Sequence, residues 1–211
     1  MTEENARRGL TLANKITLAR ILGIPVFVLL MIYYVMGLQQ GASNEYLRWS
    51  SLVLFVVVAL TDALDGYVAR SRDEITHLGR ILDPLADKAL LLSSLIMLTR
   101  PSIPALQPQI PIGFTLLVIS RDVLLFLGAV IVQAIGGHVE IRPRIVGKVA
   151  TFFQMLTIIW VLAAWSPKYF IGTVGPAFLF TAISALWYLV DGVKQLEKAA
   201  LHHAQHPTSH A

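Results

Sequence analysis

The 211-residue sequence contains no cysteine, so disulfide bonds, zinc–thiolate sites and a cysteine nucleophile are all excluded. This absence leaves the redox compartment undetermined. Charged residues are also scarce: they make up 14% of the chain, whereas hydrophobic residues make up 55%. Because soluble domains carry about 25% charged residues, the composition indicates a protein that folds in a lipid bilayer.

The sequence also lacks a basic face of the kind that binds nucleic acid, and it lacks an internal repeat. The formal net charge is +4, but lysine and arginine stand in short clusters between apolar runs, with no basic face interleaved with aromatic residues. We therefore expect no nucleic acid among the partners. The sequence also contains no internal repeat.

Long apolar runs dominate the sequence instead. A helix needs about 20 apolar residues to cross a hydrocarbon core of roughly 30 Å. We count about six such runs: Ile16–Leu38, Tyr46–Val68, Pro84–Leu98, Pro111–Ala134, Ile145–Trp165 and Tyr169–Val190. The sequence therefore predicts an all-α fold, a polytopic membrane helix bundle of about six transmembrane helices.

These runs predict a single membrane domain over residues 1–193, which includes a short cytoplasmic N-terminal segment, residues 1–15. We do not expect that segment to be a cleaved signal, because no small-residue cleavage site follows it. Residues 194–211 are predicted to form a disordered cytoplasmic tail. Metal binding by the tail is the less favoured alternative, suggested by its histidines, His202, His203, His206 and His210.

The distribution of lysine and arginine predicts the orientation, because cytoplasmic loops carry the positive excess. One set of connections and ends holds Arg7, Arg8, Lys15, Arg20, Arg70, Arg72, Arg80, Lys88, Arg142, Arg144, Lys148, Lys194 and Lys198. The opposite connections hold only Arg48, Arg100 and Lys168. We therefore expect both termini in the cytoplasm and a multi-pass protein of the bacterial inner membrane.

Four aspartates lie within the second and third predicted spans, where each ionisable residue costs about 2.5 to 3.5 kcal/mol on insertion scales. Asp62 and Asp65 share one helical face, and Asp83 and Asp87, four residues apart, share another. Counted inward from the nearest cytoplasmic arginines, both pairs lie roughly 10 to 12 Å deep. A single pair could equally be a structural ion pair, but four residues matched in spacing and depth favour a functional site.

Four carboxylates at one level would repel each other unless cations neutralise them, and oxygen ligands suit Mg²⁺, Mn²⁺ or Ca²⁺. Two ions are expected, because a carboxylate-bridged pair can clamp a phosphate group. Gly66 and Ala69 lie on the acidic face and leave space for a ligand. Arg70, at the rim, can hold a phosphate oxygen. The pattern therefore predicts a metal-dependent phosphate site.

The two acidic spans resemble the class I CDP-alcohol phosphotransferase family. The match is Asp62-x-x-Asp65-Gly66-x-x-Ala69-Arg70, eight residues, then Gly79-x-x-x-Asp83-x-x-x-Asp87, and it holds at every fixed position. Near the start, the segment LANKITLAR is similar to the family's Pro-Asn-x-x-Thr-x-x-Arg pattern, with Ala13 in place of the proline.

This resemblance implies that Asp62, Asp65 and Asp83 bind one Mg²⁺ or Mn²⁺ ion and that Asp62, Asp83 and Asp87 bind a second. It also implies that Asp87 is the general base. An acceptor alcohol would attack the phosphorus attached to diacylglycerol and expel cytidine monophosphate (CMP). The implied contacts to CDP-diacylglycerol come from Asn14, Thr17, Gly66, Ala69, Arg70, Thr76 and Gly79.

The segments LDPLADK, SRD at residues 120–122 and GKVATFFQ from residue 147 resemble the branch that contains phosphatidylglycerophosphate synthases and CDP-diacylglycerol-dependent cardiolipin synthases. We favour glycerol 3-phosphate as the acceptor, with Arg121 and Lys148 as the cations that bind its phosphate. Phosphatidylglycerol, the acceptor of a cardiolipin synthase, is the alternative. A structural role is open for both cations: Arg121 as the ion-pair partner of Asp122, and Lys148 as an ordinary cytoplasmic lysine.

Two other classes of protein fit the sequence less well than the enzyme does. An ion-coupled transporter would have acids near the membrane midplane and internal repeats, whereas here the acids lie near one side and no repeat is present. A non-catalytic scaffold is expected to have lost an aspartate, and none is lost. The expected partners are CDP-diacylglycerol, glycerol 3-phosphate or phosphatidylglycerol, and the lipid bilayer; a homodimer is left open.

The predicted orientation can be tested with thiol labelling, because the natural chain has no cysteine. Arg72→Cys and Lys198→Cys are expected to react with a membrane-impermeant maleimide only from the cytoplasmic side, and Lys168→Cys only from the opposite side. Labelling of residue 72 from outside would contradict this topology.

Overall fold

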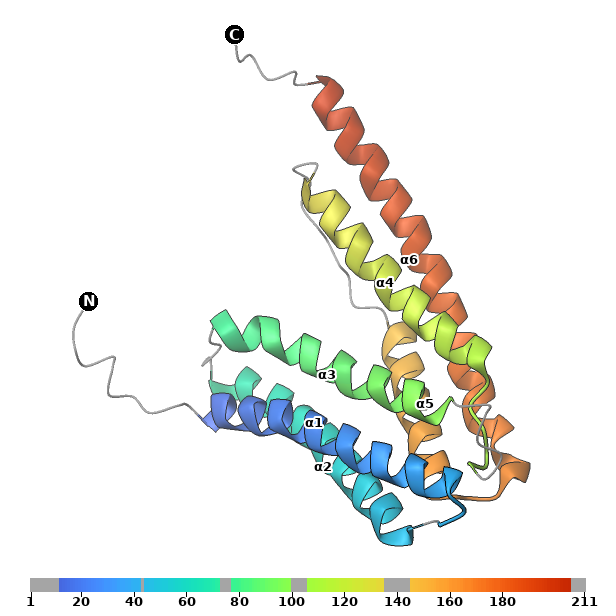
Figure 1. The fold of residues 1–211 in the computed structure, drawn as a ribbon. Helices are drawn as coiled ribbons and strands as arrows, with labels where there is room; N and C mark the ends of the chain where they lie inside the picture. The colour runs from blue at the N-terminus through green and yellow to red at the C-terminus, as the bar shows by residue number, and fades with distance from the viewer. Residues whose placement is uncertain (1–11, 43, 73–76, 100–105, 135–144, 206–211) are drawn as a thin grey trace, which may run out of the picture. The chain divides into compact units, whose positions relative to one another are not determined.

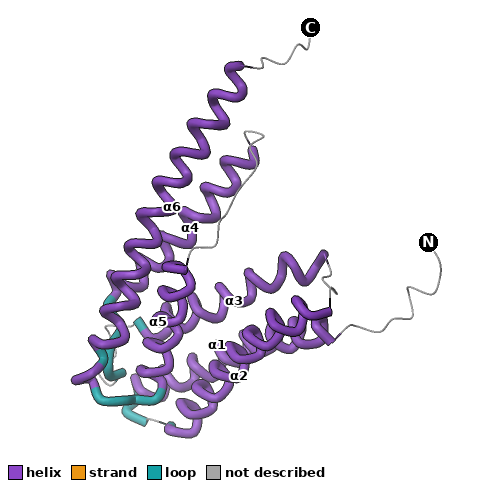
Figure 2. The backbone as a smooth tube through the Cα atoms, turned by 180° about the vertical axis from the view of Figure 1, so that it is seen from behind, coloured by secondary structure: helices purple, strands orange, loops and turns teal. Residues whose placement is uncertain are grey.

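The computed structural model describes residues 12–42, 44–72, 77–99, 106–134 and 145–205. Within these ranges the side chains of 12–21, 62–72, 77–87, 129, 132–134 and 194–205 are not described. The described chain forms six α-helices and one short 3₁₀ helix, with no strand among these residues (Figures 1 and 2). The predicted all-α fold is confirmed.

The helices follow the predicted spans closely. They are α1 (Leu12–Gln39), α2 (Glu45–Arg72), α3 (His77–Leu98), α4 (Ile112–Ala134), α5 (Ile145–Leu162) and α6 (Ile171–Gln205), with the 3₁₀ helix η2 at Pro167–Tyr169. Among the described residues, three segments are long and apolar enough to cross a membrane: Leu22–Gln39, Ile145–Leu162 and Pro167–Val193. These lengths and compositions are those of an integral membrane helix bundle.

Large apolar side chains face outward as well as inward. On α1 the exposed residues Leu22, Val26, Leu29, Tyr33 and Met36 recur every three or four positions, so they form one continuous stripe along the helix. In water such a surface would promote aggregation. In a bilayer it is solvated by lipid tails, which fits the composition of the sequence.

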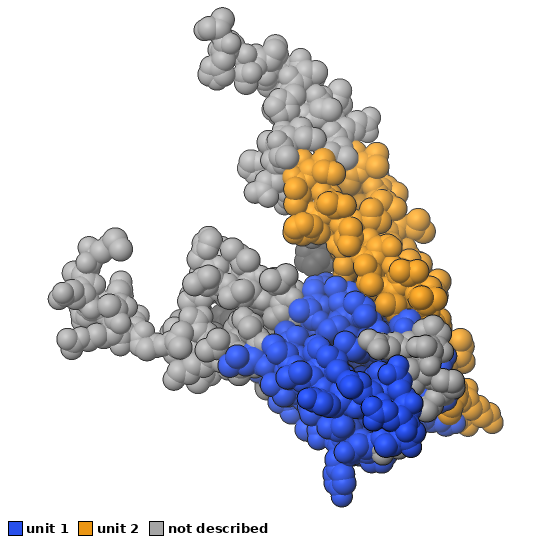
Figure 3. Space-filling model, viewed as in Figure 1, with its two compact units in different colours: residues 1–109, 158–166 blue, residues 110–157, 167–211 orange. Residues whose placement is uncertain are grey.

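The chain forms two compact units, drawn in different colours in Figure 3. Unit 1 comprises Met1–Gln109 and Ile158–Ser166; unit 2 comprises Ile110–Thr157 and Pro167–Ala211. In unit 1, α1 packs against α2 and α3, and α2 also contacts α3. Its core includes Phe27 and Phe55, whose ring centroids are 5.9 Å apart. Unit 1 therefore holds together the three helices that carry the family signature.

Unit 2 is built on the contact between α4 and α6, which run side by side in Figures 1 and 2. The rings of Phe114 on α4 and Phe178 on α6 lie 6.5 Å apart. The part of α5 that belongs to this unit packs on α6 through Phe153 and Phe180, whose rings are stacked with centroids 6.1 Å apart. These aromatic contacts align the faces of α4, α5 and α6 that carry the buried polar residues described below.

Two helices extend well beyond the apolar spans predicted from the sequence. Helix α3 begins at His77 rather than at Pro84, so Gly79 and Asp83 lie inside a continuous helix. Helix α6 continues to Gln205, beyond the predicted span that ends at Val190 and into the predicted tail, residues 194–211. The reason is local: residues 194–205 contain neither proline nor glycine and are rich in alanine, leucine, lysine and glutamine, which favour helix.

The C-terminus of α1 is closed by a Schellman motif. The amide of Ala42 donates to the carbonyl of Gly37 at 2.9 Å, and the amide of Gly41 donates to the carbonyl of Leu38 at 3.2 Å. This geometry requires a left-handed residue, and Gly41 supplies it with φ of 72°. The motif turns the chain from α1 back toward α2.

Gly41→Ala is expected to lower the melting temperature of the detergent-purified protein, because a left-handed alanine costs about 1 kcal/mol relative to glycine. Gly113→Ala is the matched control: this exposed glycine of α4 has no described atom within 4 Å of the position of an added Cβ. The control should melt at the wild-type temperature or slightly above it. Equal melting of the two variants would contradict this account of the turn.

Candidate active site

The backbone of unit 1 brings the predicted metal ligands onto two neighbouring helices. Asp62 and Asp65 lie on α2, Asp83 and Asp87 lie on α3, and the two helices are in contact. Each helix is unbroken through its motif, so each pair of aspartates keeps its helical spacing. Their side chains lie outside the described set, and the ligand geometry therefore stays a prediction.

The other residues predicted to bind CDP-diacylglycerol fall on the same three helices. Gly66, Ala69 and Arg70 lie on α2, and Gly79 lies on α3. Asn14 and Thr17 lie in the first turns of α1, a helix that packs against both α2 and α3. Thr76 lies outside the described residues, and so do the side chains of the other six. Unit 1 thus holds the predicted donor-binding positions on three helices that contact one another.

The residues present suit divalent cations by their donor chemistry. The two motifs supply carboxylate oxygens from two contacting helices, and hard cations such as Mg²⁺ and Mn²⁺ prefer oxygen ligands. Among the residues with described side chains, no group of three or more His, Cys, Asp or Glu could hold a metal ion. The four aspartates of the two motifs stay the predicted ligands of such a site.

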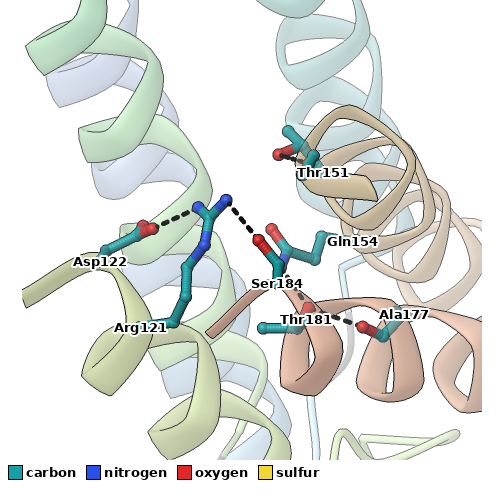
Figure 4. Close-up of polar contacts among 8 residues, drawn as sticks. Arg121, Asp122, Thr151, Gln154, Ala177, Thr181 and Ser184 are labelled. Carbon is teal, nitrogen blue, oxygen red and sulfur yellow. Dashed lines mark hydrogen bonds and ion pairs between the residues drawn. The ribbon is translucent and has the colours of Figure 1, made fainter. Parts of the chain in front are cut away.

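In unit 2 the structure shows the surroundings of Arg121 in detail (Figure 4). Arg121 lies on α4 and is 6% exposed. Its Nη1 donates to Asp122 Oδ1 at 2.7 Å, and its Nη2 donates to Ser184 Oγ on α6 at 3.2 Å. The guanidinium carbon lies 5.4 Å from the ring centroid of Tyr188, also on α6. This cation is therefore held by an ion pair, a hydroxyl group and an aromatic face.

Gly147 on α5 makes room for this arrangement. A Cβ at that position would lie 3.0 Å from Arg121 Nη2, 3.6 Å from Ser184 Oγ and 3.5 Å from the Tyr188 hydroxyl. The first of these distances is tighter than ordinary carbon–nitrogen contacts, so a side chain would press on the guanidinium. The absence of a side chain at Gly147 therefore lets α5 approach α4 and α6 at the level of Arg121.

A second polar contact between α5 and α6 involves Gln154. Its Nε2 donates to Thr181 Oγ1 at 2.8 Å, and the same hydroxyl donates to the carbonyl of Ala177 at 2.6 Å. Because the Thr181 proton is used by Ala177, the hydroxyl can only accept from Gln154, which fixes the orientation of the amide. We call Arg121, Asp122, Gln154, Thr181, Ser184 and Tyr188 the Arg121 cluster.

Two polar atoms of this cluster are buried and make no hydrogen bond with any part of the chain that the structure describes. They are Arg121 Nε, a donor, and Gln154 Oε1, an acceptor. Burying such an atom without a partner costs roughly 1 to 3 kcal/mol. Each of these atoms therefore needs an explanation beyond helix packing.

The two predicted acceptor cations differ in their surroundings. Arg121 is buried in its cluster, as the structural alternative anticipated, whereas Lys148 is exposed on α5, next in sequence to Gly147. The donor-binding positions belong to unit 1 and both cations belong to unit 2. Acceptor binding by Arg121 and Lys148 accordingly stays a prediction.

Sequence reasoning missed Gln154, Thr181, Ser184 and Tyr188. A signal was present, because three of them fall on α6 at intervals of three and four residues within an apolar span. Polar residues spaced in this way mark the face of a membrane helix that packs against protein. What the sequence could not give is which residues of α4 and α5 they contact.

Comparison with known proteins agrees with the residue pattern. A model of the CDP-alcohol phosphatidyltransferase family matches residues 10–192. The CDP-diacylglycerol–glycerol-3-phosphate 3-phosphatidyltransferase of Bacillus subtilis is 33% identical over 150 residues, 70% of this chain and 74% of the relative. The protein of the same name from Escherichia coli K12 is 28% identical over 183 residues, 83% of this chain and 89% of the relative.

A second enzyme name occurs among the similar proteins. The cardiolipin synthase (CMP-forming) of Streptomyces coelicolor is 33% identical over 154 residues, which cover 73% of this chain and 66% of the relative. The family match extends from before Asn14 to beyond Tyr188, so it includes the four aspartates and the Arg121 cluster. On these grounds the chain belongs to the CDP-alcohol phosphatidyltransferase family, as its two acidic motifs predict.

Proposed function

We propose that this integral membrane transferase is a phosphatidylglycerophosphate synthase, which transfers phosphatidyl from CDP-diacylglycerol to glycerol 3-phosphate and releases CMP. The observation that carries the proposal is the pairing of the two complete acidic motifs on contacting helices α2 and α3. Relatives from two bacteria that are named CDP-diacylglycerol–glycerol-3-phosphate 3-phosphatidyltransferase, 28% and 33% identical, support the choice of acceptor.

In this proposal Asp62, Asp65, Asp83 and Asp87 hold two divalent cations, Mg²⁺ or Mn²⁺. When bound, these ions supply the positive charge that stabilises a diphosphate as its phosphorus is attacked. Asp87 takes the proton from the attacking hydroxyl group of the acceptor, which a carboxylate can do while it remains ionised. Arg70 holds a phosphate oxygen of CDP-diacylglycerol from the end of α2.

Binding of the acceptor is assigned to Arg121 and Lys148. A phosphate monoester carries nearly two negative charges, and such a ligand suits a guanidinium held in a fixed direction together with a mobile ammonium group. Arg121 already has its Nη atoms engaged with Asp122 and Ser184, so its direction is set before a ligand arrives. The exposed Lys148 is free to follow the phosphate.

A cardiolipin synthase is the second candidate, supported by the Streptomyces coelicolor relative of that name. In that case phosphatidylglycerol is the acceptor and the same aspartates act on the same donor. We further propose that both termini lie in the cytoplasm, that the active site opens to that side, and that the membrane is a bacterial inner membrane. The positive residues on that side support this orientation.

Purified protein in detergent micelles with CDP-diacylglycerol is expected to release CMP when glycerol 3-phosphate is added, and not when phosphatidylglycerol is added. The metal chelator EDTA should abolish release, and excess Mg²⁺ or Mn²⁺ should restore it, because the carboxylates act only with bound cations. Release with phosphatidylglycerol alone would make the protein a cardiolipin synthase. Full activity after exhaustive chelation would contradict the metal mechanism.

The roles of two aspartates can be separated by isosteric substitution. Asp87→Asn keeps the size of the side chain but removes its ability to accept a proton, so kcat should fall by about 10² or more. Binding of CDP-diacylglycerol, measured by isothermal titration in the presence of Mg²⁺, should largely survive, because only one of the two proposed ions loses a charged ligand. Asp62→Asn removes a ligand shared by both ions, so it should weaken this binding as well. Equal binding by the two variants would contradict the assignment.

A further inference from the structure

The two unsatisfied atoms of the Arg121 cluster belong to side chains that bond to the same stretch of α6 in unit 2. Arg121 bonds to Ser184 and Gln154 bonds to Thr181, and these two partners are three residues apart on α6. One such step along a helix advances about 4.5 Å and keeps both residues on nearly the same face. Figure 4 draws the two side chains converging on this part of α6 from α4 and α5.

The two atoms also have complementary chemistry. Arg121 Nε can only donate a hydrogen bond, and Gln154 Oε1 can only accept one. The orientation of each group is fixed by its other bonds: Asp122 and Ser184 hold the guanidinium, and Thr181 holds the amide. A buried water can satisfy both atoms, and so can a ligand with an oxygen that accepts a bond and a hydroxyl group that donates one.

A glycerol-type acceptor has both of these groups. Glycerol 3-phosphate and the headgroup of phosphatidylglycerol each place a hydroxyl group on the carbon next to the one that bears a phosphate-linked oxygen. The hydroxyl group on the first carbon reacts, so the hydroxyl group on the middle carbon, C2, is available for recognition. Hydrocarbon tails offer no such groups; a water offers both, but its presence would not make the enzyme distinguish acceptors with and without the C2 hydroxyl group.

We propose that Gln154 determines acceptor specificity, its Oε1 accepting a hydrogen bond from the C2 hydroxyl group while Arg121 Nε donates to another oxygen of the same molecule. This inference rests on the proposed function. Gln154 is 1% exposed, so a ligand that lacks the hydroxyl group would leave its oxygen buried and unpaired. Sites of this kind reject such analogues far better than apolar pockets do.

The decisive probe is 3-hydroxypropyl phosphate, which is glycerol 3-phosphate without its C2 hydroxyl group. CMP release should show that the wild-type enzyme prefers glycerol 3-phosphate, in kcat/KM, by about tenfold or more, since one buried hydrogen bond distinguishes the substrates. Gln154→Met keeps the length of the side chain and removes the acceptor atom. This variant should lose most of the preference, mainly through a higher KM for glycerol 3-phosphate.

Thr181 provides a second pair of variants should Gln154→Met fail to fold. Thr181→Val removes the hydroxyl group that orients the Gln154 amide, so the preference should fall several-fold, whereas Thr181→Ser keeps the hydroxyl group and should retain it. The matched control is Thr157→Val on α5. Thr157 is fully buried and its hydroxyl group bonds to the carbonyl of Phe153 in its own helix, so its loss should leave the preference unchanged.

Lys148→Ala separates recognition of the hydroxyl group from recognition of the phosphate. Both substrates carry the phosphate, so this variant should raise KM for both and leave their ratio at the wild-type value. If phosphatidylglycerol proves to be the acceptor, the same comparison is made with phosphatidyl-1,3-propanediol. Equal use of the hydroxylated and deoxy acceptors by the wild-type enzyme overturns the inference alone. No CMP release with any of these acceptors overturns the proposed function and the inference together.

Discussion

The structure depends on one constraint: polar groups inside apolar helices must find partners within the protein, because lipid tails offer none. The two Nη atoms of Arg121 satisfy the constraint by an ion pair with its neighbour Asp122 and a bond to Ser184 on another helix. Thr157 and Thr181 satisfy it by bonding to carbonyls of their own helices. The side chains that reach across to another helix thereby fix how α4, α5 and α6 face each other.

Small residues make these contacts between helices possible. Hydrogen bonds of about 3 Å between side chains of different helices require the helix backbones to approach closely, and small residues allow that approach. Gly147 is the clearest case: only hydrogen at that position leaves the guanidinium of Arg121 undisturbed. In unit 1, Gly23 does the same for apolar packing, since a Cβ there would lie 3.0 Å from Val58 Cγ2. In both units, the positions of glycine residues therefore determine how closely the helices pack, as much as the positions of the larger side chains do.

The helices could be predicted well from the sequence because a membrane helix needs a run of consecutive apolar residues as long as the hydrocarbon core is thick, and such a run is visible in the sequence itself. The length of an apolar run does not fix where a helix begins: α3 begins at His77, ahead of the apolar span that starts at Pro84. The four aspartates could be recognised because their spacing is local. The Arg121 cluster could not, because its members are separated by up to 67 residues (Arg121 to Tyr188) and meet only when three helices pack.

The polar atoms of a membrane helix bundle fall into two groups: those that hydrogen-bond to a neighbouring helix or to their own helix, and those that have no such partner. Gln154 Nε2 belongs to the first group, because it donates a hydrogen bond to Thr181. Gln154 Oε1 belongs to the second, because no atom of the described residues donates a hydrogen bond to it. The same division runs through Arg121, whose Nη atoms serve packing while Nε does not. A buried polar atom without a partner in the protein lowers stability. A ligand that hydrogen-bonds to this atom recovers the free energy that its burial cost, so such an atom can be retained for ligand binding. The structural and acceptor-binding interpretations of Arg121 are therefore compatible, because they concern different atoms of one side chain.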